Sequence, residues 1–538
     1  MLRLIGILLV LGGALGIVGE LKAWELPTVR WPFTLSRELV FLRTADVNGL
    51  TGFPWFGWVW TGLLILLGCW ILAKTWRGRH LTPIMKRRVE RFREIKRGYY
   101  SLVAILCLAG VASLDHLLVG SEALAVKYDG KWVFPALTRG VEKGRDFGVT
   151  GESADAPADY RVLQRKLKNG AVENSSKLTS VIMPLLPYDP TADTITAVAT
   201  PLREKDGVVY EGSQPFNGLA SRVYDLAVPE RQHVRFKFRD GLRQGEADGW
   251  NENGERVYGA RYDQGELVTD SVNWNGEGEL AGFLAEESSK LVRVHFPPAP
   301  PTLHGGVKHV LGTTPQGFDV LAYLFGGLQV NFKAAIIYIP IVYFLGVSIG
   351  LLMGYFGGAF DLIVQRIIEI LSNIPFLFVV MIASSSVPPK IKESAGLWIV
   401  LGILILFGWM GMTYLMRTAA LKEKARDYIA ASRVIGASTP RIIFRHLLPN
   451  SIAIVVTLIP FSVSALILSL TSLDYLGFGL PPKYATWGKL LSQGLNNLSS
   501  PWLVTSAFLV LVTTLILVTF VGEAVREAFD PKKFSYYR

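Results

Sequence analysis

Long apolar runs alternate with polar stretches along this chain, and their length indicates its structure. A helix of about 20 apolar residues crosses a hydrocarbon layer of ~30 Å, whereas a soluble protein rarely needs so long a run. Such runs cover residues 4–20, 54–73, 99–119, 331–357, 360–386, 396–417, 451–475 and 502–525. We therefore expect an all-α membrane protein, a polytopic helical bundle of about eight transmembrane helices.

The first run, residues 4–20, has two interpretations. A basic start at Arg3 followed by an apolar core is also the form of a secretory signal peptide. We favour an uncleaved helix, because no convincing small-x-small cleavage site follows it and because the span at 54–73 then exits on the cytoplasmic side.

Residues 120–308 lack long apolar runs and are rich in Gly, Asp, Asn and Pro. Apolar and polar residues alternate at 233–238, which predicts short strands joined by turns. The segment 249–255 is echoed at 273–279, and the Asn-Gly steps in these segments suit tight hairpin turns. We expect an inserted, mainly-β domain with a small hairpin repeat, whose Trp residues pack the hairpins rather than bind a ligand.

Composition and charge agree with a membrane location. Apolar residues make up 50% of the chain and charged residues only 18%, and much of the net charge of +11 lies between Lys74 and Arg97. Lys and Arg accumulate in cytoplasmic loops, so we expect this basic segment inside the cell and not on nucleic acid. Residues 120 to about 330 then lie outside, and an even number of spans places both termini in the cytoplasm.

A polar stretch at 418–450 separates two of the expected spans and is patterned like two short helices. The first, from about Ala419 to Ile435, ends at Gly436, a residue type suited to a left-handed helix end. The second begins at Ser438, a hydroxyl cap before a proline, and Pro449 ends it and leads into the next span. Its apolar positions Ile442, Ile443, Leu447 and Leu448 alternate with Arg441, Arg445 and His446. The pattern alone also fits an ordinary solvated loop.

This stretch resembles the EAA coupling loop of type I ABC-importer permeases. It departs from that motif at Ala430, where the family has glutamate, and at Ser432, where it has a second alanine. The resemblance implies that the loop docks on a separate ATPase, and it implies a coupling role for Tyr428, Ala430, Ala431, Gly436, Pro440, Arg441, Arg445, His446 and Pro449.

Further segments resemble the C-type permeases of dipeptide and oligopeptide importers, and among these the E subunits of Yej-type importers. The resemblance covers residues ~99–135 and ~305–533, and the segments that carry it are 97–102, 127–135, 309–320, 354–358, 374–377, 471–481, 496–498 and 522–531. It implies an inner-membrane importer of oligopeptides, and for the Yej type also of the peptide antibiotic microcin C. The implied partners are a second, B-type permease, ABC ATPase subunits, a periplasmic peptide-binding protein and membrane lipid.

The apolar runs, the distribution of Lys and Arg and the resemblance together predict a division of the chain, although the first 80 residues and much of the external domain have no recognised counterpart in the resemblance. Residues 1–98 form an extension with two transmembrane helices and a basic cytoplasmic segment, and 99–119 form the first helix of a six-helix core. Residues 120–308 form the periplasmic domain, and 309–538 form the rest of the permease core with coupling loop 418–450.

Catalytic signatures are absent from the sequence. No Gly-x-x-x-x-Gly-Lys-Ser/Thr run, His-Glu-x-x-His, Gly-x-Ser-x-Gly or cluster of metal ligands occurs. We expect no catalytic, cofactor or metal site in this chain, with ATP and Mg²⁺ bound by the partner ATPase. A secondary transporter would need inverted repeats with paired midplane carboxylates, and a sensor would need a cytoplasmic output domain; neither signal is found.

Three ionisable residues fall inside the expected spans or at their ends. Arg366 and Glu369 stand three positions apart on one helix, and Asp474 lies near a helix end. Charges at membrane depth usually face protein or a water-filled cavity, so all three are candidates for lining the translocation path. Arg366 and Glu369 can instead neutralise each other, and we favour that structural pairing.

Overall fold

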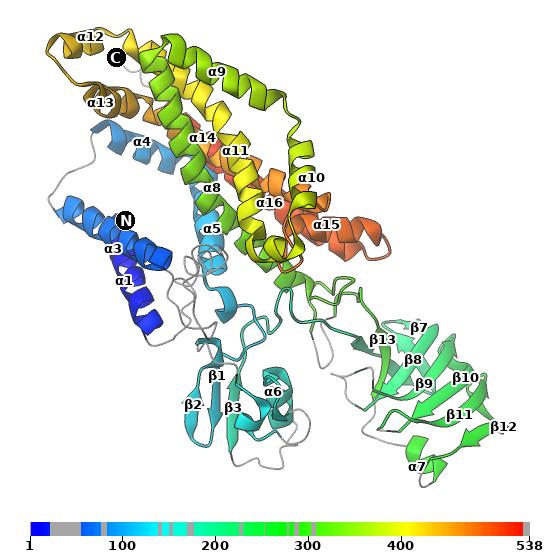
Figure 1. The fold of residues 1–538 in the computed structure, drawn as a ribbon. Coiled ribbons are helices and arrows are strands. Elements are labelled where there is room, and N and C mark those ends of the chain that lie inside the picture. Colours follow the sequence, from blue (N-terminus) through cyan, green and yellow to red (C-terminus); the bar gives the residue numbers. More distant parts are fainter. Residues whose placement is uncertain are drawn as a thin grey trace. The chain divides into compact units, whose positions relative to one another are not determined.

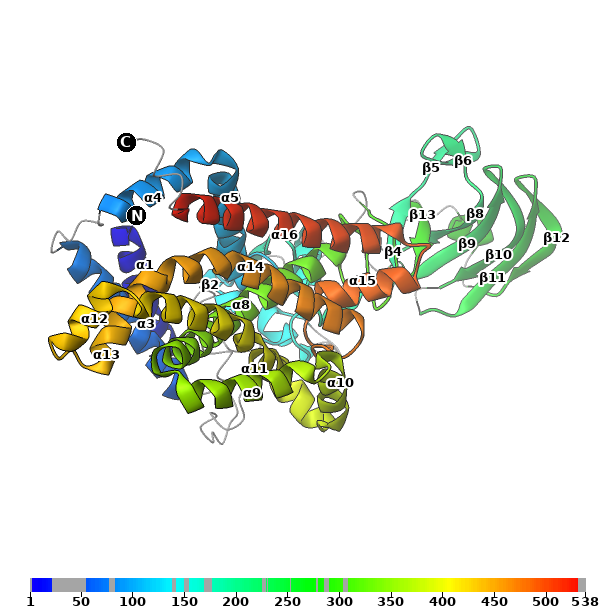
Figure 2. The ribbon, with the colours of Figure 1, turned by 90° about the horizontal axis from the view of Figure 1, so that it is seen from above.

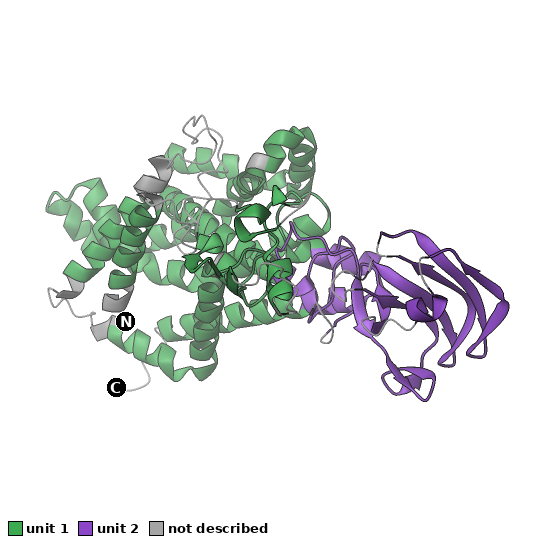
Figure 3. Cartoon of the chain, turned by 90° about the horizontal axis from the view of Figure 1, so that it is seen from below, with its two compact units in different colours: residues 1–187, 325–489, 509–538 green, residues 188–324, 490–508 purple. Residues whose placement is uncertain are grey.

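The computed structural model describes residues 2–21, 55–76, 83–137, 142–149, 154–168, 177–224, 229, 231–251, 253–276, 279–284, 290–302 and 308–530. The chain divides into two compact units, shown in green and purple in Figure 3. The first comprises residues 1–187, 325–489 and 509–538, and the second comprises residues 188–324 and 490–508.

Four helical stretches in the described part of the chain are long and apolar enough to cross a membrane. They are α8 (Val320–Phe356), the part of α11 (Pro389–Lys424) that begins at Ala395, the continuous stretch Thr439–Tyr475, and α16 (Pro501–Phe529). Two bent helix pairs raise this number to six if each pair is one span. The protein is thus helical and membrane-like with four to six apolar spans, and the expected number of eight is not confirmed.

The expected span at 360–386 is not a single rod. It consists of α9 (Gly358–Asn373) and α10 (Phe376–Ser386), whose axes differ by 73°. Pro375 disfavours a helical conformation in the residue before it, and Ile374 is extended, with φ −78° and ψ 121°. The span beginning near residue 99 is likewise part of a bent pair, α4 (Pro83–Glu94) and α5 (Lys96–Ser113), with an angle of 94°.

Glycines allow close helix packing in the first unit. Gly346, Gly350 and Gly354 stand four residues apart on α8, and an added Cβ at each would come within 2.7 Å of atoms of α11. Small residues at this spacing let two helix backbones approach in a membrane, where close packing rather than water exclusion drives association. At the facing positions of α11, Met416 and Ala420 are fully buried.

The helices α1 (Leu2–Leu21) and α3 (Trp55–Trp76) form a similar pair. An added Cβ at Gly68 would lie 2.8 Å from the Gly6 carbonyl oxygen. Their described apolar segments, Gly6–Gly19 and Thr61–Ala73, are shorter than the four long spans. The backbones of these two expected spans therefore approach closely through glycine.

The second unit contains an antiparallel seven-stranded sheet in the order β12-β11-β10-β9-β8-β13-β4. Figure 2 shows most of these strands side by side. Two hairpin turns carry the positive φ angles of tight turns, at Asp240–Gly241 and Gln264–Gly265. The strands are β4 (Val198–Pro201), β8 (Gly218–Val223), β9 (Gln232–Arg239), β10 (Leu242–Trp250), β11 (Arg256–Asp263), β12 (Glu266–Trp274) and β13 (Lys290–His295).

The expected hairpin repeat is only half correct. Residues 251–255 do join β10 to β11, but the chain after β12 continues into a short helix, α7 (Leu280–Leu284), instead of a hairpin. The ring centroid of Trp274 lies 4.9 Å from that of Phe283, and Trp274 packs on the core of the sheet. Its expected packing role is therefore confirmed.

Smaller sheets complete the β-structure. One, in the order β2-β1-β3, belongs to the first unit, and helix α6 packs on it through buried Tyr160 and Leu163. The other has the order β5-β6-β7. The bounds are β1 (Ala125–Tyr128), β2 (Lys131–Val133), β3 (Leu178–Ile182), α6 (Tyr160–Lys168), β5 (Arg203–Lys205), β6 (Val208–Glu211) and β7 (Gln214–Pro215).

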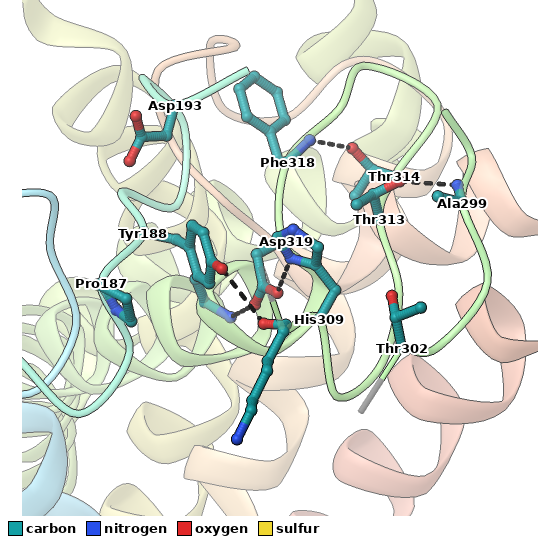
Figure 4. Close-up of polar contacts among 12 residues, drawn as sticks. Pro187, Tyr188, Asp193, Ala299, Thr302, His309, Thr313, Thr314, Phe318 and Asp319 are labelled. Atoms are coloured by element: carbon teal, nitrogen blue, oxygen red, sulfur yellow. Dashed lines mark hydrogen bonds and ion pairs between the residues drawn. The ribbon is translucent and has the colours of Figure 1, made fainter. Parts of the chain in front are cut away.

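A buried polar turn in the second unit fixes the start of α8 (Figure 4). His309 Nδ1 and Asp319 Oδ2 lie 2.8 Å apart, and both side chains are almost fully buried. The other carboxylate oxygen of Asp319 accepts the Ala322 N–H at 2.8 Å and so caps the helix. The Tyr188 ring packs on His309 with centroids 4.7 Å apart. This turn lies within the segment 309–320, which carried part of the family resemblance.

Candidate functional site

The coupling-loop candidate contains two short helices, but their boundaries differ from those expected. Helix α11 ends at Lys424, the chain becomes extended at Arg426, and α12 covers Asp427–Val434. The single helix expected at 419–435 is thus wrong, since a break divides it. Gly436 adopts a φ of +81°, as its position at a helix end predicts. Figure 1 shows α12 and α13 at one end of α11 and α10 at the other.

The expected stop at Pro449 is also wrong. Helix α13 (Thr439–Ile442) continues through the π-helical turn η6 (Ile443–Leu447) into α14 (Leu448–Tyr475) as one stretch. Proline lacks an N–H and its ring clashes with the preceding turn of an α-helix. The wider π-turn immediately before Pro449, where the Leu448 N–H donates to the Ile443 carbonyl, accommodates the proline without ending the helix.

The expected amphipathic pattern of this stretch is confirmed. Ile442, Ile443 and Leu447 are buried, whereas Arg441 and Arg445 are exposed. Ser438 occupies the N-cap position, but its side chain makes no capping hydrogen bond.

The loop also exposes large apolar side chains that the residue pattern did not single out. Val434 is 88% exposed, Ile435 85% and Phe444 68%. Apolar groups presented this openly among charged residues are typical of a surface that contacts another protein. The sequence did contain a signal for this exposure, since Val434 and Ile435 directly precede Gly436, the glycine at the turn of the loop.

Tyr428 links three parts of the loop. Its hydroxyl donates to Glu423 Oε2 at the end of α11 and accepts from Asn450 Nδ2 at the start of α14, both at 2.6 Å. Burial, followed by the hydrogen bond to the Glu423 carboxylate, raises the pKa of Tyr428. The phenol therefore stays protonated at neutral pH and can donate to Glu423, so it braces α12 against both long helices.

Tyr355, at the end of α8, forms a second brace. The guanidinium of Arg433 lies 5.2 Å from its ring centroid, and the ammonium of Lys424 lies 5.7 Å from it. Lys424 also donates to the Tyr355 backbone carbonyl, and the Tyr355 hydroxyl is 3.5 Å from the hydroxyl of Thr439. Tyr355 belongs to the segment 354–358, but nothing in the pattern of the sequence indicated these partners.

The remaining expected coupling residues lie on the same loop. Ala430, Ala431, Pro440 and Pro449 are exposed, and His446 is half-buried with its ring 6.1 Å from that of Tyr428. The structure thus places all the candidate residues on α12, the turn at Gly436, α13–η6 and the first turn of α14. Among the described residues, no cluster of three His, Cys, Asp or Glu side chains is placed to hold a metal ion.

The three translocation-path candidates do not form one group. Arg366 Nη1 donates to Glu369 Oε2 in an exposed pair on α9. Asp474 is 96% buried at the end of α14, where its Oδ1 accepts the Leu480 N–H at 2.7 Å. The geometry gives Asp474 a structural role, because it holds the turn after Tyr475.

An ion pair that the sequence reasoning missed lies between α9 and α11. Arg417 donates from Nε and Nη2 to the two carboxylate oxygens of Asp361, each at 2.6 Å. The side chains are only 25% and 11% exposed. Two-point contacts of this kind fix orientation as well as distance. The sequence did contain a signal for this pair, because Asp361 lies at the start of the expected span 360–386 and Arg417 lies at the end of the expected span 396–417.

The features described so far agree with known transport proteins. The family of binding-protein-dependent transport system inner membrane components matches residues 346–535, which include the whole coupling-loop candidate. The inner membrane ABC transporter permease protein YejE of Escherichia coli is 31% identical over 453 residues, which are 84% of this chain and 98% of the relative. The chain belongs to this permease family.

Other relatives of the permease carry names from peptide transport. It is 41% identical over 223 residues to the peptidoglycan transport system permease protein YejE of Agrobacterium fabrum, which covers 41% of the permease and 57% of the relative. It is 31% identical over 234 residues to the oligopeptide transport system permease protein OppC of Mycobacterium tuberculosis. This match covers 43% of the permease and 79% of the relative. The resemblance to C-type and Yej-type permeases is confirmed, and the permease is a multi-pass inner membrane protein and a transport subunit.

Proposed function

We propose that the chain is the E-type permease subunit of an ABC importer that carries oligopeptides across the bacterial inner membrane. Its relatives are named for oligopeptide, dipeptide and peptidoglycan transport, and the E. coli relative matches over nearly its whole length. The complete importer contains a second permease, ABC ATPase subunits and a periplasmic peptide-binding protein. Peptide antibiotics such as microcin C fall within its substrate class.

The braced coupling loop is the observation that carries this proposal. The loop exposes the apolar side chains of Val434, Ile435 and Phe444, which we call its apolar tip, and Arg441 and Arg445 are exposed on the same loop. Such a tip can fill an apolar cleft on an ATPase while the arginines meet acidic groups at its rim. Helical backbone is already hydrogen-bonded, so the docked loop moves as a rigid body.

Conversion of ATP hydrolysis into helix motion follows from the contacts of the loop. Tyr428 connects the loop to α11 and α14, and Tyr355 connects it to the end of α8. When the ATPase subunits close on nucleotide, a displacement of the docked tip is passed to three long helices at once. ATP and Mg²⁺ are held by the ATPase, and this chain contributes the mechanical connection.

The departure at Ala430 changes one detail of the docking. Alanine cannot form the ion pair available to the glutamate of the family motif, and Ala430 is exposed. We propose that the apolar tip and the two arginines supply the contact in its place. Arg441→Ala/Arg445→Ala is then expected to release the ATPase more readily than the same change in a permease that has the glutamate.

The experiment is co-expression of the chain with a B-type permease, ABC ATPases and a peptide-binding protein, followed by purification and reconstitution in liposomes. We expect the four components to co-purify and oligopeptide to stimulate ATP hydrolysis and to accumulate in the lumen. Microcin C and peptidoglycan fragments serve as further substrates. A complex without an ATPase, or ATP hydrolysis and uptake indifferent to every peptide, would overturn the proposal.

A further inference from the structure

Helix α4 meets α5 at an angle of 94°, and Figure 1 shows it crossing the end of α5. Ile95, with φ −78° and ψ 81°, is the residue at which the chain turns. The backbone stays hydrogen-bonded across the bend, because the Ile95 N–H donates to the Arg91 carbonyl at 3.3 Å and the Tyr99 N–H donates to the Ile95 carbonyl at 3.1 Å. Since α5 is an expected membrane span, we expect α4 to lie nearly parallel to the membrane plane.

Two exposed tyrosines indicate the level at which α5 leaves the hydrocarbon layer. Tyr99 is 39% exposed and Tyr100 66%, and both stand in the first turns of α5, directly after Arg97 and Gly98. Tyrosine is enriched at membrane–water interfaces, where its ring lies among the lipid headgroups. The rest of α5, residues 101–113, contains no charged residue. Helix α4 therefore leaves α5 at the level of the headgroups.

One side of α4 and the bend is held against the end of α16, and Figure 2 shows the two helices beside each other there. Gly98 packs directly on Ala524, since an added Cβ at this glycine would overlap the Ala524 side chain. Further along α4, the guanidinium of Arg88 lies 4.7 Å from the ring centroid of Phe529. These contacts fix the direction of α4 relative to two helices of the first unit.

The other side of α4 and the bend is strongly cationic. Residues 86–97 include seven basic and two acidic residues, a net charge of +5. Lys86 Nζ lies 3.9 Å from Glu90 Oε1, and Arg97 Nη2 lies 3.6 Å from Glu523 Oε2. Three further basic residues are exposed and form no ion pair within the described part of the chain. They are Arg87, Arg93 and Lys96. Their charges are free to attract an external anion.

An apolar side chain accompanies these charges. Val89 is 40% exposed, three positions after Lys86 and four before Arg93, so the three residues share one face of α4. Basic and apolar side chains together on an exposed helix are typical of a helix that lies in the membrane interface. An acidic protein surface would also attract the arginines, but it would not require the helix to lie at headgroup level. The position of α4 therefore favours lipid as the occupant of this face.

We propose that α4 is an interfacial helix whose residues Arg87, Arg93 and Lys96 bind the phosphate groups of anionic phospholipids. The planar guanidinium of arginine matches two phosphate oxygens, and the lysine ammonium supplies a point charge. Each such charge near an anionic membrane surface favours binding by about fivefold. Because α4 is joined to α5 and packed on α16, bound lipid holds the ends of both helices at a fixed depth. This role is independent of which substrate the permease carries.

The test uses the full chain in phosphatidylcholine nanodiscs, with Cys69 and Cys107 replaced by Ser and a fluorophore attached to Val89→Cys. Phosphatidylglycerol and phosphatidylcholine that carry a nitroxide near the glycerol end of one acyl chain are added separately, and quenching measures how each gathers at α4. We expect phosphatidylglycerol to associate at least about fivefold more strongly. At about 1 M salt, where the Debye length is ~3 Å, the preference should largely disappear.

Variants assign the preference to the three residues. Arg87→Gln/Arg93→Gln/Lys96→Gln should reduce the ratio of the two association constants to about one, because the phosphate then meets no positive charge at these positions. Arg87→Lys/Arg93→Lys/Lys96→Arg is the matched control, which keeps every charge and should keep the preference. All three side chains are exposed, so both variants should fold, and their thermal unfolding midpoints in detergent check this.

Several outcomes would overturn the inference. Absence of quenching by either lipid would place α4 in water, and equal quenching by both lipids in the unsubstituted helix would leave no anionic site. A preference that persists in the glutamine variant would assign the lipid to other residues. Equal quenching by both lipids, combined with loss of a co-purifying ATPase in the glutamine variant, would assign this face to an acidic protein surface.

A second measurement needs no fluorophore. The native chain and the two variants are purified from membranes in a neutral detergent, and the lipids that remain bound are quantified by mass spectrometry. We expect the native chain and the charge-conserving variant to retain several times more phosphatidylglycerol per protein than the glutamine variant, with equal amounts of zwitterionic lipid. Equal retention of phosphatidylglycerol by all three would contradict a specific role of Arg87, Arg93 and Lys96.

Discussion

Gly436 is the residue at which backbone geometry limits substitution most clearly. Its φ of +81° lies in the left-handed region, and no atom stands within 4 Å of the position of an added Cβ. Only the backbone therefore opposes a larger residue, by about 1–2 kcal/mol. A substitution at Gly436 therefore tests conformational strain of the backbone without steric overlap.

For Gly436→Val we expect a normally assembled complex in which ATP hydrolysis continues while peptide uptake falls several-fold, because a strained turn reorients α12 relative to α13. Gly436→Asn is the matched control, since asparagine tolerates the left-handed conformation. The measurement is the ratio of peptide imported to ATP hydrolysed in proteoliposomes. Equal ratios for both variants and the wild type would remove the turn from the coupling mechanism.

The Asp361–Arg417 pair allows a stability prediction at the same scale. Removing one partner of a buried pair leaves an unpaired charge at a cost of 3–5 kcal/mol, and the partial exposure of Arg417 lowers our expectation for Arg417→Met to about 3 kcal/mol. The thermal unfolding midpoint of the purified protein in detergent measures it. Asp361→Asn/Arg417→Met should recover part of the loss.

Arg366→Met is the control for that experiment. The Arg366 side chain is 74% exposed, and exposed pairs contribute at most about 1 kcal/mol. A midpoint for Arg417→Met no lower than that of Arg366→Met would contradict the structural role of the Asp361–Arg417 pair. If Arg366→Met leaves both the unfolding midpoint and transport unchanged, Arg366 neither stabilises the protein by pairing with Glu369 nor lines the translocation path.

Residue roles could be predicted from the sequence only where local geometry determines them. The left-handed Gly436 and the buried positions Ile442 and Leu447 follow from helix-end chemistry and periodicity. The contacts of Tyr355 could not be predicted, because they join α8 to residues some 70 to 85 positions later. The partner of Asp361, Arg417, is likewise 56 residues away in the sequence. Helical or strand periodicity relates only residues a few positions apart, so it could not identify this pair.

At the scale of elements, two prolines show what a sequence pattern leaves open. Pro375 follows an extended residue and ends a helix, whereas Pro449 lies inside a continuous helix because a π-turn precedes it. Both prolines disfavour the regular α-helix. The outcome depends on whether the preceding turn can widen, which is decided by packing around η6 and not by the proline itself.

The brace between α8 and the coupling loop is open to test at this scale. Tyr355→Leu removes the aromatic face for Arg433, and cation–π contacts at exposed sites contribute about 0.5–1 kcal/mol. We expect faster hydrogen exchange in α12 and little change elsewhere in α8. Tyr355→Phe keeps the face and loses only the long contact to Thr439, so it should exchange like the wild type. Equal exchange for Leu and Phe would show that the ring does not hold the loop.

At the scale of the whole molecule, the orientation of the chain is the main expectation still to be measured. We expect the β-domain outside and the coupling loop inside, from the distribution of Lys and Arg. After replacement of the native Cys69 and Cys107 by Ser, a single cysteine at Glu246, exposed in the sheet, should react with an impermeant reagent added to spheroplasts. A cysteine at Ser438 should react only after lysis.

The reverse labelling pattern would contradict the topology and with it the docking role of residues 418–450. The membrane character, the β-insert and the presence of a patterned polar stretch at 418–450 followed from the lengths and spacing of the apolar and polar runs, whereas the permease class and the docking role of that stretch came from the family resemblance. The number of spans is not confirmed, because two of the eight expected spans are bent helix pairs and two, in α1 and α3, have described apolar segments shorter than the four long spans.

The unbroken stretch from Thr439 to Tyr475 has a mechanical consequence. It has 37 residues, corresponding to about 55 Å of helix, with the docking tip at one end and the turn that carries Phe478 and Gly479 just beyond the other. A seesaw motion of about 5° around its middle would shift each end by about 2–3 Å in opposite directions. On the expected topology, one tilting rod would move its outer end and its inner end in opposite directions at once, with no separate signal between the two sides of the membrane.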